Sequence, residues 1–181
     1  MTRIPPVTRE EMSDEQKRVY DDVKATTGRV GGPSLGYIYS PGLWESNNQV
    51  SDYIQDCGIT QAQTRIAAIV TARFWEAQYP WAVQVQAALA AGVDRAVVDA
   101  VNDGRPPDLP DAGDQVVYDI ATEILNTKKV SQTTYDKAVE VIGYQGLVDA
   151  VGVVGHFTLV GMVAITAEVD PPPDAPVALN V

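Results

Sequence analysis

The chain has 181 residues, 45% of them hydrophobic, which is the composition of a single globular domain with a sizeable core. Its formal net charge of −11 argues against a nucleic-acid surface, because phosphates repel an acidic protein and no stripe of Lys or Arg offsets the charge. Cys57 is the only cysteine, which excludes an internal disulfide, a CxxC pair and a thiolate zinc site. The N-terminal segment lacks the apolar region of a signal peptide, so we expect a cytoplasmic protein.

The first part of the chain predicts two helices joined by a loop. Ser13 and Gln16 form a capping box before "DEQKRVYDDVKATTG", and Gly28 is expected to end that helix. The segment "GRVGGPSLGYIYSPG" is rich in Gly and Pro and is expected to be a loop. Ser40, followed by proline, then begins a second helix that we expect to end at Gly58.

The middle of the chain predicts a broken helical pair. Thr60 begins a helix with a second capping box, and residues 65–93, "RIAAIVTARFWEAQYPWAVQVQAALAAGV", continue it to a break near "YPW". Pro80 is tolerated there because it falls in the first turn of the next helix. Asp94 caps a short helix that runs through Asn102.

Helical spacing predicts three further helices, over residues 114–127, 132–143 and 147–169. Within the last, residues 150–167 are apolar over the length of a membrane span, but the stretch contains His156 and no Lys or Arg flanks it. We therefore expect a buried central helix or an oligomer interface and no membrane contact.

No stretch alternates with period two, so the fold class is all-α. The expected organisation is one helical domain over residues 1–170 and a Pro-rich tail over 171–181. The tail is expected to be extended, with a neighbouring subunit as one surface on which it could lie.

Three segments occur in a characteristic order: "GGPSLGYIYSPGLWE", "QAQTRIAAIVTARFWEAQYPWAVQVQAALAAGV", and the run from "DLPDAGDQVVYDIATEIL" to "VSQTTYDKAVEVIGYQGLVDAVGVVGHFTLVGMV". Together they resemble the carboxymuconolactone decarboxylase family, which includes the AhpD-like alkylhydroperoxidases. The resemblance implies an AhpD-like helical bundle that forms homo-oligomers, commonly trimers or hexamers, with small pockets near the subunit contacts. It also implies reactions without a metal or organic cofactor: decarboxylation of lactone acids from aromatic catabolism, or peroxide reduction by a CxxC pair.

The chain departs from the family at the positions that carry this chemistry. The family histidine falls on Gln84, and the glutamate of the usual Tyr-Glu-Trp run falls on Pro80. The earlier helix glutamate falls on Arg65, and the two peroxidase cysteines fall on Ala77 and Pro80. A thiol peroxidase is therefore not expected, since no paired thiolate is available as nucleophile. Of the local signature, only Tyr79 and the tryptophan after Pro80 remain.

Three residues are the main candidates for replacement chemistry. Arg65 could hold a carboxylate or phenolate, and Gln84 could hydrogen-bond a substrate oxygen although it cannot exchange protons. His156, the only histidine, could carry a proton. The structural alternatives are a surface charge pair for Arg65 and a packed core histidine for His156.

Five further residues complete the candidate site. Tyr79 is a candidate hydrogen-bonding partner of a developing oxyanion, and Glu76 is a candidate base on the same helix face as Arg65. Trp75, Trp81 and Tyr37 could form an aromatic wall or cover for a flat substrate, although aromatic residues at helical spacing are more often core. No metal-ligand spacing and no phosphate-binding loop is found, so no cofactor is expected.

Two functions remain open from the residues, since a redox accessory role for Cys57 alone is disfavoured by its expected place near a helix C-terminus, where the helix dipole disfavours a thiolate. The first is a cofactor-independent lyase, decarboxylase or isomerase acting on a small oxygenated acid or aromatic-derived compound. The second is a non-catalytic oligomeric binding or scaffold protein that has lost the family's catalytic residues. The two differ in whether Arg65 and His156 share a ligand-sized hollow.

Overall fold

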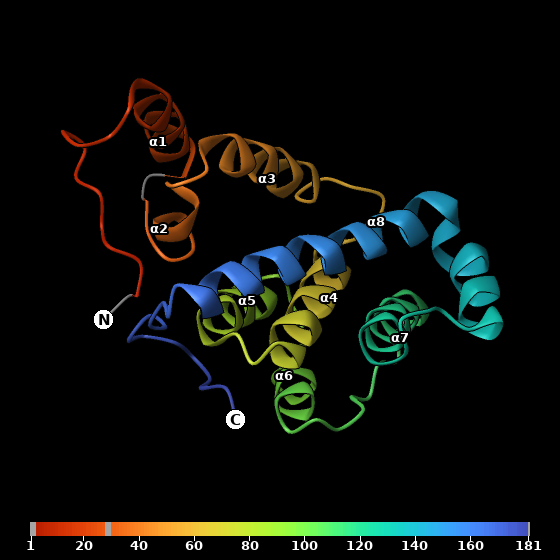
Figure 1. Ribbon diagram of the computed structural model, residues 1–181. Helices are drawn as coiled ribbons and strands as arrows, with labels where there is room; N and C mark the ends of the chain where they lie inside the picture. Colours follow the sequence, from red (N-terminus) through yellow and green to blue (C-terminus); the bar gives the residue numbers. More distant parts are fainter. Residues whose placement is uncertain (1–2, 28–29, 181) are drawn as a thin grey trace.

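The computed structural model describes residues 3–27 and 30–180, and every regular element in this part of the chain is an α-helix (Figure 1). The all-α prediction is therefore confirmed. In chain order the helices are α1 (Asp14–Thr27), α2 (Ser34–Tyr37), α3 (Pro41–Tyr53), α4 (Gln61–Phe74), α5 (Gln78–Ala90), α6 (Arg95–Asn102), α7 (Ala112–Thr127) and α8 (Gln132–Thr166).

Helix α4 is the centre of the molecule. It packs against α5, α6, α7 and α8, and its residues Ile66, Ala67, Ala68, Ile69 and Ala72 are almost wholly buried. Helices α1, α2 and α3 lie together on one side, around a smaller apolar cluster of their own that includes Tyr37 and Trp44 (Figure 1). Both α2 and α3 also contact α8, so the two clusters meet along that helix.

The predicted starts of α1, α4 and α6 are confirmed by their capping bonds. The Ser13 backbone N–H donates to Gln16 Oε1 at 2.8 Å, and Gln16 N–H donates back to Ser13 Oγ at 3.2 Å. Thr60 forms the same reciprocal box at the start of α4, and the Asp94 carboxylate caps α6. Gly28, the expected end of the first helix, lies outside the described residues.

Two predictions on the segment before α4 are wrong. A one-turn helix, α2, lies inside the predicted loop, because a single turn is too short to show periodicity. Helix α3 ends at Tyr53 and not at Gly58. The buried Asp149 carboxylate of α8 accepts bonds from the Tyr53 hydroxyl at 2.9 Å and the Gly58 N–H at 2.7 Å, which ties this segment to α8.

The breaks between the later helices follow from single residues. The break after α4 is confirmed: Glu76 takes a positive φ of 52°, and Pro80 lies in the first turn of α5. The two predicted helices after Ser131 are both present: α8 consists of two helical segments that meet in a kink at Gly143, whose φ of 69° favours glycine. Helix α8 is long and apolar enough to cross a bilayer, but 44% of its most apolar window is buried inside the protein, and core helices pass the same test.

The Pro-rich tail lies on its own chain. The Trp81 indole N–H donates to the Val177 carbonyl at 3.0 Å, and Val177 is itself part of the main core. The Asn102 side chain donates to the Ala178 carbonyl at 2.9 Å and accepts from the Asn180 N–H at 2.8 Å. The tail therefore closes the side of the molecule formed by α5 and α6.

Asn102→Ala should release this tail, because both hydrogen bonds depend on one side chain that is only 4% exposed. We expect a loss of about 1–3 kcal/mol in the free energy of unfolding by urea and faster proteolysis near the C-terminus. Asn126→Ala is the control, since that amide bonds only the Thr122 carbonyl of its own helix. Equal stability of the parent and the Asn102 variant would contradict the assigned role of the tail.

Candidate functional site

Five elements meet around a hollow of about 200 Å³, which we call the Arg65 pocket. Arg65 comes from the second turn of α4, Gln84 from α5, His156 from α8 and Tyr37 from α2. The structure thus brings together four of the eight residues predicted for the site. The other lining residues come from the start of α2, from α3 and the segment after it, and from α8. They are Pro33, Ser34, Trp44, Asn47, Asn48, Ser51, Gln55, Phe157 and Val160.

The Arg65 guanidinium is held by neutral groups. It donates to the amide oxygens of Gln84 at 3.0 Å, Gln55 at 2.7 Å and Gln61 at 3.1 Å. Within residues 3–27 and 30–180 it forms no ion pair with a carboxylate. Partial burial lowers the pKa of Arg65, yet a guanidinium stays protonated at neutral pH. The pocket therefore carries an uncompensated positive charge.

His156 presents an unsatisfied ring nitrogen. The residue is 8% exposed, and its Nδ1 has no hydrogen-bond partner among the described residues. Burial lowers the pKa of His156 to about 4, because the charged imidazolium loses its hydration. The imidazole is consequently neutral at pH 7. Its ring stands edge-on to Phe157, with ring centroids 4.9 Å apart.

Tyr37 presents a second unsatisfied group in the same pocket. It is 3% exposed, and its hydroxyl has no hydrogen-bond partner in the described part of the chain. Burial raises the pKa of Tyr37 to about 12, so the phenol keeps its proton. A buried polar atom without a partner is costly, and a bound ligand is one way to satisfy it.

The two tryptophans predicted for an aromatic wall do not line this pocket. Trp81 is fully buried in the main core and bonds the tail at Val177. Trp75, at the end of α4, donates its indole N–H to Thr158 Oγ1 at 3.2 Å. Trp75 therefore connects α4 to α8 and Trp81 connects α5 to the tail, and neither residue lines the Arg65 pocket.

Tyr79 and Glu76 line another hollow, near the end of α8, and not the Arg65 pocket. The ring of Tyr79 covers Gly32, where a Cβ would come within 2.2 Å of it. Glu76 lies beyond the end of α4, in the turn with positive φ, so it does not share a helix face with Arg65. Its side chain is exposed.

Several pocket residues carried no signal in the sequence. Asn47, which is 9% exposed, and Gln55 reach the pocket from α3 and the segment after it. The sequence gives no sign that an amide side chain on a helix surface belongs to a site. Only the packing of α3 against α8 places these side chains in the pocket. Among the described residues, no group of three or more His, Cys, Asp or Glu side chains could hold a metal ion.

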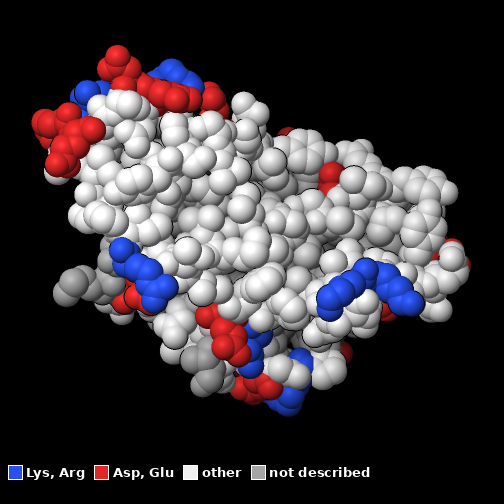
Figure 2. Space-filling view, in the orientation of Figure 1, with Lys and Arg blue, Asp and Glu red and all other residues white. Residues whose placement is uncertain are grey.

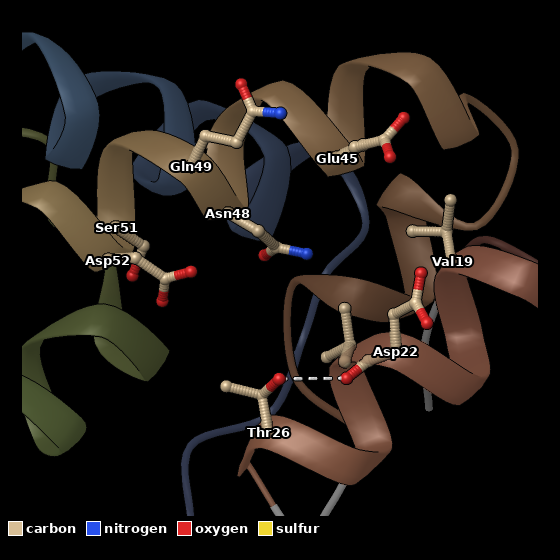
Figure 3. A pocket seen from close by; sticks show the side chains of 9 residues that line it. Val19, Asp22, Thr26, Glu45, Asn48, Gln49, Ser51 and Asp52 are labelled. Atoms are coloured by element: carbon tan, nitrogen blue, oxygen red, sulfur yellow. Dashed lines mark hydrogen bonds between the residues drawn. The ribbon is translucent and has the colours of Figure 1, made fainter.

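A second hollow, of about 230 Å³, lies between α1 and α3 and is acidic (Figure 3). Asp22, Glu45 and Asp52 line it, and none of the predicted site residues does. Arg18 partly neutralises it by pairing with Glu45 at 2.7 Å and Asp22 at 3.6 Å. We assign it no function.

The fold is the AhpD-like, carboxymuconolactone decarboxylase-like fold, as two solved structures show. The first, titled as the alkylhydroperoxidase AhpD core of an uncharacterized peroxidase-related protein from Ralstonia eutropha JMP134, superposes with a TM-score of 0.76 at 17% identity, covering 96% of this chain and 93% of that one. The second, an uncharacterized peroxidase-related protein from Silicibacter sp. TM1040, gives a TM-score of 0.74 at 13% identity, covering 98% and 94%. Comparison of the sequence with protein-family models and with curated proteins gives no match.

The buried, neutral His156 should make stability depend on pH. Its pKa is about 4 in the folded state and about 6.5 when unfolded, so the unfolded chain binds the extra proton between these values. The contribution of the neutral His156 to stability is fully present above pH 6.5 and is lost as the pH falls toward 4. Between pH 7 and pH 5 the loss from this group is on the order of 2 kcal/mol.

The measurement is urea unfolding of the parent and of His156→Gln at pH 7 and pH 5. For each protein, the pH slope is the change in the free energy of unfolding between pH 7 and pH 5. Since the chain has one histidine, the difference between the two slopes gives the contribution of His156. Identical slopes for parent and variant would mean that His156 is hydrated or charged in the folded protein.

Proposed function

We propose that the protein is a cofactor-independent enzyme of the lyase, decarboxylase or isomerase type that acts on a small oxygenated acid or aromatic-derived compound. One observation carries the proposal: the residues that line a single pocket include an arginine without an ion pair among the described residues and two residues, Tyr37 and His156, that each have a buried polar atom without a partner. A hollow of about 200 Å³ has room for a one-ring compound, since a cavity of roughly 150 Å³ can hold benzene. The positive charge favours an anion.

Each side chain has a distinct role in this proposal. Arg65 binds the negative charge of the substrate or of the oxyanion that forms during reaction, and Gln84 holds the guanidinium in place. The protonated Tyr37 hydroxyl donates a hydrogen bond to the same oxyanion. Tyr37 thus takes the role that the sequence suggested for Tyr79, which lies outside the pocket.

His156 is the proposed proton carrier. In a decarboxylation, the electron pair of the broken C–C bond moves into an adjoining carbonyl as an enolate while CO₂ leaves, and a proton must then be added to carbon. An imidazole with a pKa near 4 is a weak base in the empty pocket. A bound anion beside it would raise that pKa toward neutrality, so substrate binding itself would prepare the group for proton transfer.

The main alternative is a non-catalytic binding protein. That function would be favoured by an Arg65 facing bulk solvent or by a pocket filled with Trp75 and Trp81. Here Arg65 is half-buried in a pocket, and neither tryptophan lines that pocket. The proposal gives no role to Cys57, whose thiol lies outside the Arg65 pocket, and it includes the expected cytoplasmic location.

The test is an assay of turnover with lactone acids and hydroxylated aromatic acids, in which CO₂ release and loss of substrate are measured. Arg65→Met removes the charge and keeps the length, and His156→Gln removes the titrating group. We expect kcat/KM to fall on the order of a hundredfold for each variant. Arg95→Gln is the matched control, because among the described residues Arg95 pairs with Asp99 alone, on the surface of α6.

Two outcomes separate the alternatives. If both pocket variants turn over substrate at the parent rate, the proposed site is wrong. If the acids bind to the parent, bind weakly to the Arg65 variant and are never converted, the binding-protein alternative holds.

We also propose that the chain forms a homo-oligomer, a trimer or hexamer, through α8. After the kink, the exposed face of this helix carries Tyr144, Val148, Val151, Gly155, Met162 and Ile165. Together with Thr158, which lies between Gly155 and Met162, these residues are separated alternately by four and three positions, which is the spacing of a coiled-coil seam. Figure 2 shows that the middle of this face carries few charged residues, whereas acidic residues gather over α1.

A second copy of the chain is the occupant that this face fits. A seam with coiled-coil spacing is self-complementary, and Gly152 and Gly155 leave open space for close approach of a partner helix. The stripe runs for roughly 30 Å along α8, long enough for several layers of contact.

Val148→Glu should shift the protein to a smaller species in light scattering after size exclusion, because it places a charge in the seam. Thr133→Glu adds the same charge to an exposed position of α8 before the kink and should leave the mass unchanged. A monomeric parent at about 100 μM would refute the proposal, and binding to phosphatidylcholine vesicles would assign the face to a bilayer instead.

A further inference from the structure

A hollow of about 330 Å³ lies between the C-terminal part of α4, the end of α6 and α7, away from every residue discussed above for catalysis. Arg73 and Phe74 line it from α4, Arg105 from the segment after α6, and Tyr118 and Thr122 from α7. Its volume falls within the usual range of small-molecule sites. We call it the Arg73 pocket.

The charge of this lining is opposite to that of the whole protein. The chain has a net charge of −11, yet two arginines and no carboxylate line the pocket. Arg73 donates through Nε to the Asn102 carbonyl at 2.9 Å, which fixes the guanidinium, and it pairs with no carboxylate of the described residues. Its two terminal nitrogens remain available to an anion.

Arg105 is only partly neutralised. It pairs with Asp103 at 2.9 Å, but the two side chains are 62% and 44% exposed, and exposed pairs of this kind are weak. Asp103 also accepts a bond from the Asn180 amide, which draws it toward the tail. Arg105 can therefore turn its remaining donors to a ligand.

Thr122 adds an independent observation. Its hydroxyl oxygen is buried and has no hydrogen-bond partner in residues 3–27 and 30–180. A threonine in a helix commonly bonds the carbonyl one turn earlier, and this one does not. The Thr122 carbonyl is occupied by the Asn126 amide at 2.8 Å, so the side-chain oxygen alone is unsatisfied. A ligand oxygen would supply the missing partner once the Thr122 side chain turns its hydroxyl toward the pocket.

We propose that the Arg73 pocket binds a phosphate monoester of a small organic alcohol. Two arginines and a threonine from three separate segments line this pocket, and guanidinium groups are well suited to bind phosphate oxygens. Phe74, which is 41% exposed, and Tyr118 provide an apolar surface for the organic part. This site goes beyond the proposed function, since it lies at the opposite end of α4 from Arg65, roughly 12 Å away along the helix.

The test uses phenyl phosphate as the probe, with calorimetric titration of the full chain at pH 7.5 and 50 mM NaCl. We expect saturable binding that Arg73→Gln and Arg105→Gln each weaken at least about tenfold and that added salt weakens. Benzoate, with one charge and two oxygens, should bind at least about tenfold more weakly than phenyl phosphate. Inorganic phosphate should also bind more weakly, because it lacks the ring.

Thr122→Val gives a readout that does not depend on charge. Valine keeps the shape and removes the unsatisfied hydroxyl, so the ligand-free variant should melt at the same temperature as the parent or higher, while its affinity for phenyl phosphate falls several-fold. Circular dichroism of every variant checks that the fold is retained. A lower melting temperature for this variant would mean that the hydroxyl has a structural partner.

Two controls separate this proposal from the proposed function. Arg95→Gln, on the surface of α6, should bind phenyl phosphate like the parent. Arg65→Met should keep the binding that depends on Arg73 and Arg105, because it leaves the Arg73 pocket unchanged. If the Arg65 variant loses binding, if the Arg73 and Arg105 variants keep parental affinity, or if phenyl phosphate does not bind at millimolar concentration, the Arg73 pocket is not a phosphate site.

Discussion

The positive charge of Arg65, which is half-buried and has no carboxylate partner among the described residues, is the constraint on which the candidate site depends. Three glutamine oxygens hold the guanidinium in place, but they are neutral and leave its charge uncompensated. A charge in this environment is stabilised because three of the five guanidinium N–H donors are bonded, and the other donors can bind an anion. The neutral forms of His156 and Tyr37 follow from the same low-dielectric surroundings.

Helix α4 gives the molecule both its core and its candidate sites. Its buried residues are mostly small or β-branched, which lets α5, α7 and α8 pack closely around it. Its two ends emerge from this packing, and each carries an arginine into a hollow, Arg65 near the start and Arg73 near the end. A rigid central helix therefore fixes the separation of two positively charged pockets in an otherwise acidic protein.

The aromatic residues around the helix break have structural roles in this chain. Trp81 is fully buried and bonds the tail, Trp75 bonds α8, and Tyr79 covers Gly32. Each ring contributes apolar burial and connects segments that are distant in the chain. Similarity around the helix break therefore indicates the fold, whereas the chemistry of the pocket has to be judged from the side chains that line it.

The sequence by itself determined the helical class, the starts of α1, α4 and α6, and the break before Pro80, because capping and proline effects act within one turn of chain. It could not decide that α3 ends at Tyr53 or that the tail lies on α5 and α6. Those features depend on Asp149 and Asn102, which bond residues far away in the sequence. The same holds for the site: tertiary packing alone placed His156 and Tyr37 beside Arg65 and left Glu76 and Tyr79 elsewhere. Spacing along a helix determines which residues share a face, but only packing between helices determines which faces enclose a pocket.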